Sequence, residues 1–163
     1  MRSIGPAAGG DAPKVLRRLL LAVLTLGLLG TGAELVAFDH FEDVWQAIPI
    51  GLILVALAVV FWNATAVSPA SVRAMQLLMG AFVAAGLLGI YLHYVGNLEF
   101  QLEMDPSQSR WALFTNVIQA KAPPSLAPGS MAQLGLLGLI WSYRHPAMAR
   151  RPAPTSSPAT PGE

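Results

Sequence analysis

Two histidines, His40 and His93, are the residues of this sequence best suited to bind a ligand. Each follows a long apolar stretch and has acidic residues close by, and Asn97 lies one helical turn after His93. Imidazole nitrogens and carboxylate oxygens bind zinc, iron, manganese and copper, and two facing histidines can hold a haem iron. The candidate ligands of a transition-metal ion or of haem b are His40, His93, Glu34 and Glu99.

The same residues belong to a larger polar cluster that also has a purely structural interpretation. No spacing in the sequence matches a metal motif such as HExxH or the CxxCH motif of covalent haem attachment. Histidines and acids at a membrane surface also cap helices and hydrogen-bond to loop backbone, with no ion bound. We favour this structural interpretation and keep the metal site as the sharper alternative. The polar cluster consists of Glu34, Asp39, His40, Glu42, Asp43, His93, Asn97 and Glu99.

Glu34 is the only ionisable residue well inside an apolar stretch that could cross a membrane. Charged side chains in hydrocarbon are costly and are usually retained for function. Sixteen residues separate Arg18 from Glu34, which is about 24 Å along a helix and places the carboxylate just below the far membrane surface. This position suits either a carboxylate bonded to a neighbouring helix or the coupling group of a small oligomeric cation-coupled carrier.

The composition indicates that an integral membrane protein carries these residues. Of the 163 residues, 54% are hydrophobic and 12% are charged, whereas soluble proteins carry about 25% charged residues. A mean hydropathy of +0.53 excludes a disordered chain. The absence of cysteine excludes disulfide scaffolds and thiol nucleophiles, and the net charge of +1 gives no indication of a nucleic-acid partner.

Four apolar stretches are long enough, one of them marginally, to cross a bilayer as helices. They cover residues 18–38, 44–62, 74–94 and 126–143. We therefore expect an all-α membrane protein, a four-transmembrane-helix bundle over residues 14–145. Pro128 in the fourth stretch is tolerated if Ser125 is the N-cap, because the first helical N–H groups lack partners in any helix. The first stretch could instead be a cleaved signal peptide, because basic residues precede it and small residues occupy positions 30–33.

The basic residues are distributed unequally between the two sides of the membrane, which predicts the orientation of the chain. With both termini in the cytoplasm, the inner side holds eight basic and two acidic residues, a net charge of +6. The outer side then holds two basic and seven acidic residues, a net charge of −5. We expect a multi-pass protein of the bacterial inner (cytoplasmic) membrane with both termini cytoplasmic.

Three segments are expected to lie outside the membrane. Residues 1–13 and the Pro-rich tail 146–163 are expected to be disordered, and residues 97–124 to form the one sizeable outer loop. Ser71 is the expected N-cap of the third span, and Asp43 is expected at the N-terminus of the second, where the helix dipole favours a carboxylate.

Two different patterns follow each other within the outer loop. Polar and apolar residues alternate over Asn97–Asp105, which is the period of a strand. Apolar residues then recur at helical spacing over Pro106–Ala120, with Asp105 as the expected N-cap. We expect this second part to be a short amphipathic helix that lies on the outer membrane surface.

The function that these features favour is a non-catalytic accessory or interaction subunit with an acidic, histidine-containing outer cap. Its expected partners are the lipid bilayer and either another membrane protein or a second copy of this chain. We do not expect an enzyme, because the sequence lacks a G-x-S-x-G elbow and its glycines do not form a phosphate-binding loop. The metal- or haem-binding protein and the carrier remain as alternatives.

Overall fold

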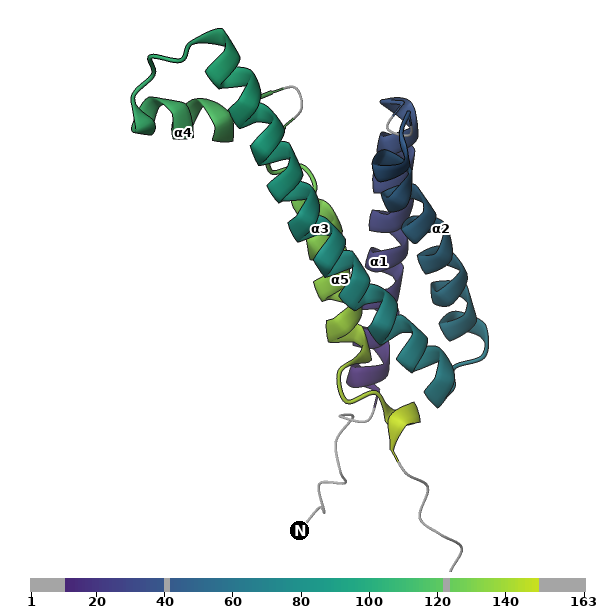
Figure 1. The fold of residues 1–163 in the computed structure, drawn as a ribbon. Helices are drawn as coiled ribbons and strands as arrows, with labels where there is room; N and C mark the ends of the chain where they lie inside the picture. The colour runs from purple at the N-terminus through teal and green to yellow at the C-terminus, as the bar shows by residue number, and fades with distance from the viewer. Residues whose placement is uncertain (1–10, 40–41, 122–123, 150–163) are drawn as a thin grey trace, which may run out of the picture.

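A computed structural model of the protein describes residues 11–39, 42–121 and 124–149. In these residues every regular element is a helix, and the polypeptide forms no strand (Figure 1). The elements are α1 (Ala12–Ala37), α2 (Val44–Thr65), α3 (Pro69–Met104), α4 (Arg110–Ile118), α5 (Gly129–Ser142) and the short 3-10 helix η1 (Pro146–Met148). Helices α1, α2 and α3 are each long and apolar enough to cross a membrane, which supports a membrane protein.

Both segments expected to be disordered contain helical residues. Helix α1 begins at Ala12, because Pro13 fits the first turn of a helix, where no N–H donor is needed. Residues of the expected tail form η1, which lies against α3. Residues 1–10 and 150–163 lie outside the described residues.

Local hydrogen bonds cap the N-termini of α2 and α3. The Asp43 carboxylate accepts the backbone N–H of Gln46 at 2.9 Å, which confirms the predicted start of α2. The predicted cap of α3 is wrong, because Ser68 and not Ser71 is the N-cap. Ser71 is the third helical residue, and the two serines cap each other in a capping box. The Ser71 hydroxyl also donates to the buried Asn63 side chain at 2.9 Å, which fixes the turn between α2 and α3.

The strand predicted over Asn97–Asp105 is wrong, because α3 continues without a break to Met104. An alternating pattern forms a strand only where another strand can pair with it, and the described residues offer none. Continuing an existing helix costs much less than starting a new element. With 36 residues, α3 is about 54 Å long and exceeds the roughly 30 Å thickness of hydrocarbon.

Within the segment predicted as a helix, Pro106–Ala120, only α4 is helical; it begins at Arg110 and its N-cap is Ser109. Asp105 ends α3 instead, and its carboxylate accepts the hydroxyl and the backbone N–H of Ser107 at 2.6 and 2.9 Å. These two bonds lower the pKa of Asp105. The carboxylate is therefore occupied in a local turn and does not cap α4.

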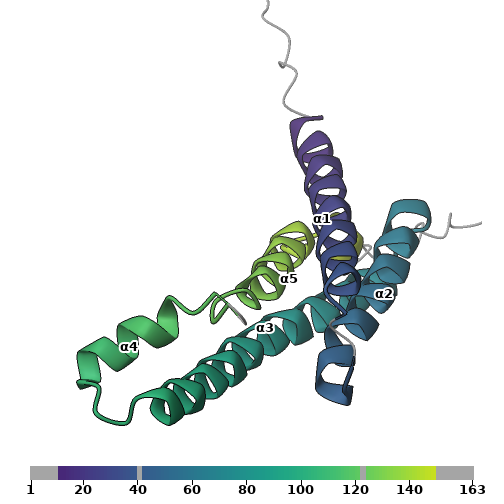
Figure 2. The same cartoon turned by 90° about the horizontal axis from the view of Figure 1, so that it is seen from above.

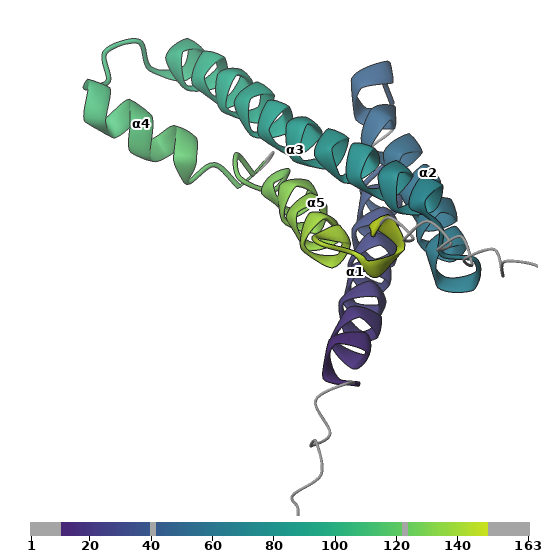
Figure 3. The same ribbon diagram turned by 90° about the horizontal axis from the view of Figure 1, so that it is seen from below.

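Helix α5 packs along α3 more extensively than any other pair of helices, as Figures 2 and 3 show from opposite sides. Glycines allow this close approach. A Cβ atom at Gly86 would lie 2.5 Å from the backbone nitrogen of Ala132, and one at Gly135 would lie 2.6 Å from the carbonyl oxygen of Met79. Backbone atoms cannot move aside as side chains do, so both positions require glycine.

The fourth span was predicted to start near Ser125, but α5 begins at Gly129 and its N-cap is Pro128. Ser125 is instead a buried residue of the preceding segment. Its hydroxyl donates to the carbonyl of Val117 in the last turn of α4 at 2.6 Å, so it does not cap the start of α5. The 14 residues of α5 span about 21 Å, which is shorter than a usual crossing.

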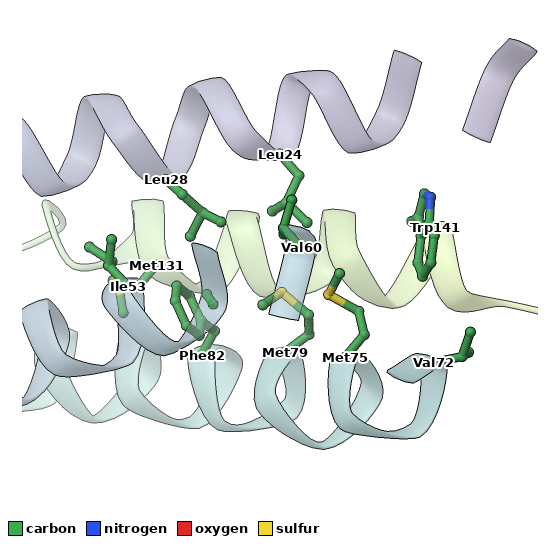
Figure 4. Close-up of a cluster of buried hydrophobic side chains, with 11 residues drawn as sticks. Leu24, Leu28, Ile53, Val60, Val72, Met75, Met79, Phe82, Met131 and Trp141 are labelled. Carbon is green, nitrogen blue, oxygen red and sulfur yellow. The ribbon is translucent and has the colours of Figure 1, made fainter. Parts of the chain in front are cut away.

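The hydrophobic core lies where α1, α2, α3 and α5 cross (Figure 4). The α3 residues that face it recur three and four positions apart, which places them on one side of the helix. Beyond this crossing, the α1–α2 pair and α3 diverge (Figure 1). The core consists of Leu24, Leu28, Ile53, Ala56, Val60, Val72, Met75, Met79, Phe82, Met131 and Trp141.

The two ends of the molecule carry opposite charges. One end of the molecule contains the start of α1, the turn between α2 and α3, and the C-terminus of α5 (Figure 1). We call this the basic end; its described basic residues are Lys14, Arg17, Arg18, Arg73 and Arg144. The opposite, acidic end carries Glu34, Asp39, Glu42, Asp43, Glu99, Glu103 and Asp105. The charge asymmetry predicted from the sequence is therefore also an asymmetry of the fold.

Candidate functional site

His93 and Asn97 of α3 hold the segment that leads into α5. The Nδ1 atom of His93 lies 2.9 Å from the carbonyl oxygen of Pro124, and the Asn97 amide donates to the Ser125 hydroxyl at 2.9 Å. Ser125 in turn donates to the carbonyl of Val117 at the end of α4. We call these five residues the loop latch, because they join α3, α4 and the start of the return toward α5.

The loop latch connects side chains of α3 to the irregular segment that precedes α5. His93 and Asn97 are four residues apart on one helix and therefore share a face. Asn97 and Ser125 are 4% and 1% exposed, so their polar groups must find partners inside the protein. Non-helical backbone at or near membrane depth is tolerated only where such partners exist. His93 and Asn97 therefore both hydrogen-bond to the segment that precedes α5.

Four other described members of the polar cluster occupy a different arm of the molecule. Glu34, Asp39, Glu42 and Asp43 lie near the α1–α2 turn, whereas Glu99 lies on α3, which diverges from α1 and α2 at this end (Figure 1). Among the described residues, the exposed Glu34 side chain forms no hydrogen bond or ion pair with another side chain. His40 lies outside the described residues.

Within residues 11–39, 42–121 and 124–149, no three histidine, cysteine or acidic side chains lie close enough to hold a metal ion. The predicted ligand set includes His40, which belongs to none of these ranges. The transition-metal or haem site formed by His40, His93, Glu34 and Glu99 therefore stays a prediction.

A second connection between distant parts of the chain was not expected from the sequence. The guanidinium of Arg17 donates to the backbone carbonyls of Trp141, Tyr143 and Arg144. The last carbonyls of a helix lack partners within it, so Arg17 caps the C-terminus of α5 from α1. A basic residue before an apolar run signals only orientation, and nothing local in the sequence indicates a contact across 124 to 127 residues.

A groove of about 450 Å³ lies between α1 and α2. Its lining is aliphatic throughout and includes Leu28, Val36, Ile53 and Leu57. Such a surface can contact an acyl chain or another helix, but it offers no group for acid–base or nucleophilic chemistry.

Comparison with models of known protein families, with curated proteins and with solved structures yields no match to this chain.

Proposed function

We propose that this protein is a non-catalytic accessory subunit of a membrane assembly that binds a partner protein through its acidic end. The observation that carries the proposal is the outer arm, which we define as residues 98–118. In this arm, α3 continues past the other helices and α4 folds back across its end (Figure 1). A projection of this kind does not contribute to the core and is available to another molecule.

The outer arm presents acidic and apolar side chains together. Met104 and Trp111 are 70% and 73% exposed, and Trp111 stacks on Phe114 with ring centroids 5.8 Å apart. Its acidic side chains, Glu99, Glu103 and Asp105, are also exposed. Exposed aromatic and methionine side chains within a charged rim are typical of protein interfaces. The partner surface should therefore be apolar at its centre and basic at its rim.

We further propose that the chain crosses the membrane four times, as the sequence predicts. Arg17 near the start of α1 contacts the end of α5, so the chain returns to the end where it began. A return to the same side requires an even number of crossings. The segment from Pro124 to Pro128 lengthens the short α5, because it follows α3 from His93 to Gly89. Helix α4 lies across the direction of α1 and α2, as expected of a helix on the outer membrane surface (Figure 1).

The excess of basic residues at one end favours an orientation with that end in the cytoplasm. We expect cysteines introduced as Ala8→Cys and Thr155→Cys to react only with thiol reagents that cross the inner membrane, and Gln108→Cys to react with impermeant ones. Labelling in intact and permeabilised cells measures this directly, because the chain contains no cysteine of its own. Reaction of the Thr155→Cys variant with an impermeant reagent in intact cells would contradict the orientation.

Photo-crosslinking tests the proposed partner surface. We expect a photoreactive phenylalanine analogue at Met104 or Trp111 to give a protein adduct of one defined mass. The same analogue at Leu77, which is 78% exposed on α3 nearer the basic end, is the matched control and should give none. Reversing the charge of Glu99 and Glu103 to lysine should reduce the adduct at least about tenfold, since like charges across an interface cost several kcal/mol.

The mass of the adduct identifies the class of partner. An adduct of twice 17.2 kDa would identify a second copy of the chain, and a larger one a different protein. Adducts with lipid alone, or protein adducts that survive the charge reversal unchanged, would refute an acidic docking surface.

One contact favours the metal-binding alternative. Because the Pro124 carbonyl is an acceptor, the Nδ1 atom of His93 must carry the hydrogen in their 2.9 Å bond. Metal-binding histidines are commonly oriented by such a bond, which leaves the lone pair on the Nε2 atom. We propose this as the second candidate function. Elemental analysis and a visible spectrum of the purified protein decide it, and His93→Gln should then remove most of the bound metal.

A further inference from the structure

The bonds of Arg17 bring basic side chains from the two ends of the chain together. The guanidinium lies 3.1 Å from the carbonyl oxygen of Tyr143 and 3.3 Å from that of Arg144. Lys14 and Arg18 are four residues apart on α1 and share a face next to this contact. Three basic side chains, those of Lys14, Arg18 and Arg144, are therefore exposed around the junction of α1 and α5.

The backbone after α5 is shaped around the guanidinium of Arg17. Arg144 has a φ of 45°, a left-handed conformation that is uncommon for a residue with a side chain. This conformation allows the carbonyls of residues on both sides of the turn to reach Arg17. The Arg144 guanidinium then lies 5.5 Å from the centre of the Tyr143 ring, which is 66% exposed. The charge of Arg144 is held at the surface next to an exposed aromatic ring.

Little negative charge offsets these residues. At the basic end of the described chain the one acidic residue is Asp11, whose 3.3 Å pair with Lys14 is largely exposed and contributes little. His145 packs on Trp141 with ring centroids 4.7 Å apart, and burial together with the nearby Arg17 charge lowers its pKa. His145 is thus neutral at pH 7, and the net charge of the junction comes from lysine and arginine.

We propose that this junction binds the phosphate of an anionic phospholipid, with Arg18 from α1 and Arg144 after α5 as the principal contacts and Lys14 beside them. Guanidinium groups match the oxygen geometry of a phosphate. The side chains that follow Arg18 toward the membrane favour a lipid over a free phosphate ion. Leu19 and Val23 are 57% and 56% exposed on α1 and offer an apolar surface to the acyl chains.

The site would hold α1 against α5 through the headgroup. Both elements also contribute to the core, so a bound lipid would stabilise the folded state. This stabilisation grows with the logarithm of the ratio of lipid concentration to dissociation constant. This inference does not depend on the proposed function, because the site lies at the opposite end from the outer arm.

Lipid titration of the full chain in dodecyl maltoside micelles tests the proposal. We expect dioleoyl phosphatidylglycerol to raise the thermal unfolding midpoint, followed by circular dichroism, at a concentration at least about tenfold lower than dioleoyl phosphatidylcholine. The variant R18Q/R144Q should need about tenfold to thirtyfold more phosphatidylglycerol, since each basic residue contributes roughly fivefold to binding an anionic surface. The control R110Q/K121Q, which removes the two basic residues near the acidic end, should behave like the parent protein.

Three outcomes would overturn the proposal. They are an unchanged phosphatidylglycerol titration in R18Q/R144Q, an equal loss in R110Q/K121Q, and an equal effect of soluble glycerol phosphate, which would assign the site to a free anion. If the double variant does not fold, Arg18→Gln alone decides, because this exposed side chain lies outside the core. The charge-conserving R18K/R144K should retain most of the preference for phosphatidylglycerol. The substituted residues of the test variant, Arg18 and Arg144, lie at the opposite end from the outer arm. Failure of the lipid titration and failure of the crosslinking experiment are therefore distinguishable.

Discussion

Replacing Gly86 by alanine should lower the stability of the protein by about 2 kcal/mol, because the added methyl group has no space between α3 and α5. Its Cβ atom would lie 2.5 Å from the backbone nitrogen of Ala132 and 2.9 Å from the carbonyl oxygen of Pro128. Both are backbone atoms, so the two helices must separate along their most extensive contact. For a chain of this size, we expect the unfolding midpoint in detergent to fall by about 4–8 °C. Circular dichroism measures this.

The same helix provides a matched control for this substitution. A Cβ atom at Gly80 would have no heavy atom within 4 Å, and Gly80 is exposed. Gly80→Ala should leave the midpoint unchanged or raise it, since alanine is favoured over glycine by up to about 1 kcal/mol in a helix. The variant Gly135→Ala should behave like Gly86→Ala, because its Cβ atom would lie 2.6 Å from the Met79 carbonyl oxygen. An equal midpoint in Gly86→Ala and Gly80→Ala would show that α3 and α5 are not in close contact.

The sequence was sufficient to predict the helices that depend on a long apolar stretch or on a short-range capping bond. Apolar length alone predicts α1, α2 and the membrane part of α3, because a chain in hydrocarbon must satisfy its backbone bonds internally. The start of α2 was also predictable, since the Asp43 bond to Gln46 spans only three residues. The opposite charges of the two ends followed from counting basic residues.

The errors arise where distant contacts decide the local structure. Alternation over Asn97–Asp105 resembles a strand, but whether a strand forms depends on a pairing partner, which this pattern does not reveal. The start of α5 was misplaced for a related reason. A serine followed by a proline is compatible with the N-terminus of a helix, so Ser125 was expected to cap α5. The Ser125 hydroxyl instead accepts the Asn97 amide and donates to the Val117 carbonyl.

The candidate site was predictable only in part for the same reason. Spacing placed His93 and Asn97 on one helix face, and the structure places both against the segment before α5. Their partners, Pro124 and Ser125, are 31 and 28 residues away, and no local pattern specifies such pairs. The contact of Arg17 with the end of α5 escaped sequence reasoning entirely, although it determines which basic residues meet at the basic end.

Removing the hydroxyl of Ser125 should open the loop latch and expose the chain around Lys121 to protease. Ser125→Ala removes two hydrogen bonds at once, the one from the Asn97 amide and the one to the Val117 carbonyl. Each buried polar group that loses a partner costs about 1–3 kcal/mol. We therefore expect the free energy required to open the loop to fall by about 2–4 kcal/mol. Trypsin should then cleave after Lys121 roughly thirtyfold faster or more, since a tenfold change in the open population corresponds to about 1.4 kcal/mol.

A second serine separates the loop latch from a general effect of losing a hydroxyl. Among the described residues, the exposed Ser130 hydroxyl donates only to the carbonyl of Ala127, three residues before it. Ser130→Ala should therefore be cleaved at Lys121 as slowly as the parent protein. His93→Ala should accelerate cleavage less than Ser125→Ala, because the bond of His93 to the Pro124 carbonyl is exposed to solvent, whereas the Asn97–Ser125 bond is buried. Mass spectrometry of the tryptic fragments identifies the cleavage site. Cleavage of Ser125→Ala at the parental rate would mean that α3 holds this segment by packing and that the polar contacts of His93 and Asn97 serve another purpose, with metal binding the next to be tested.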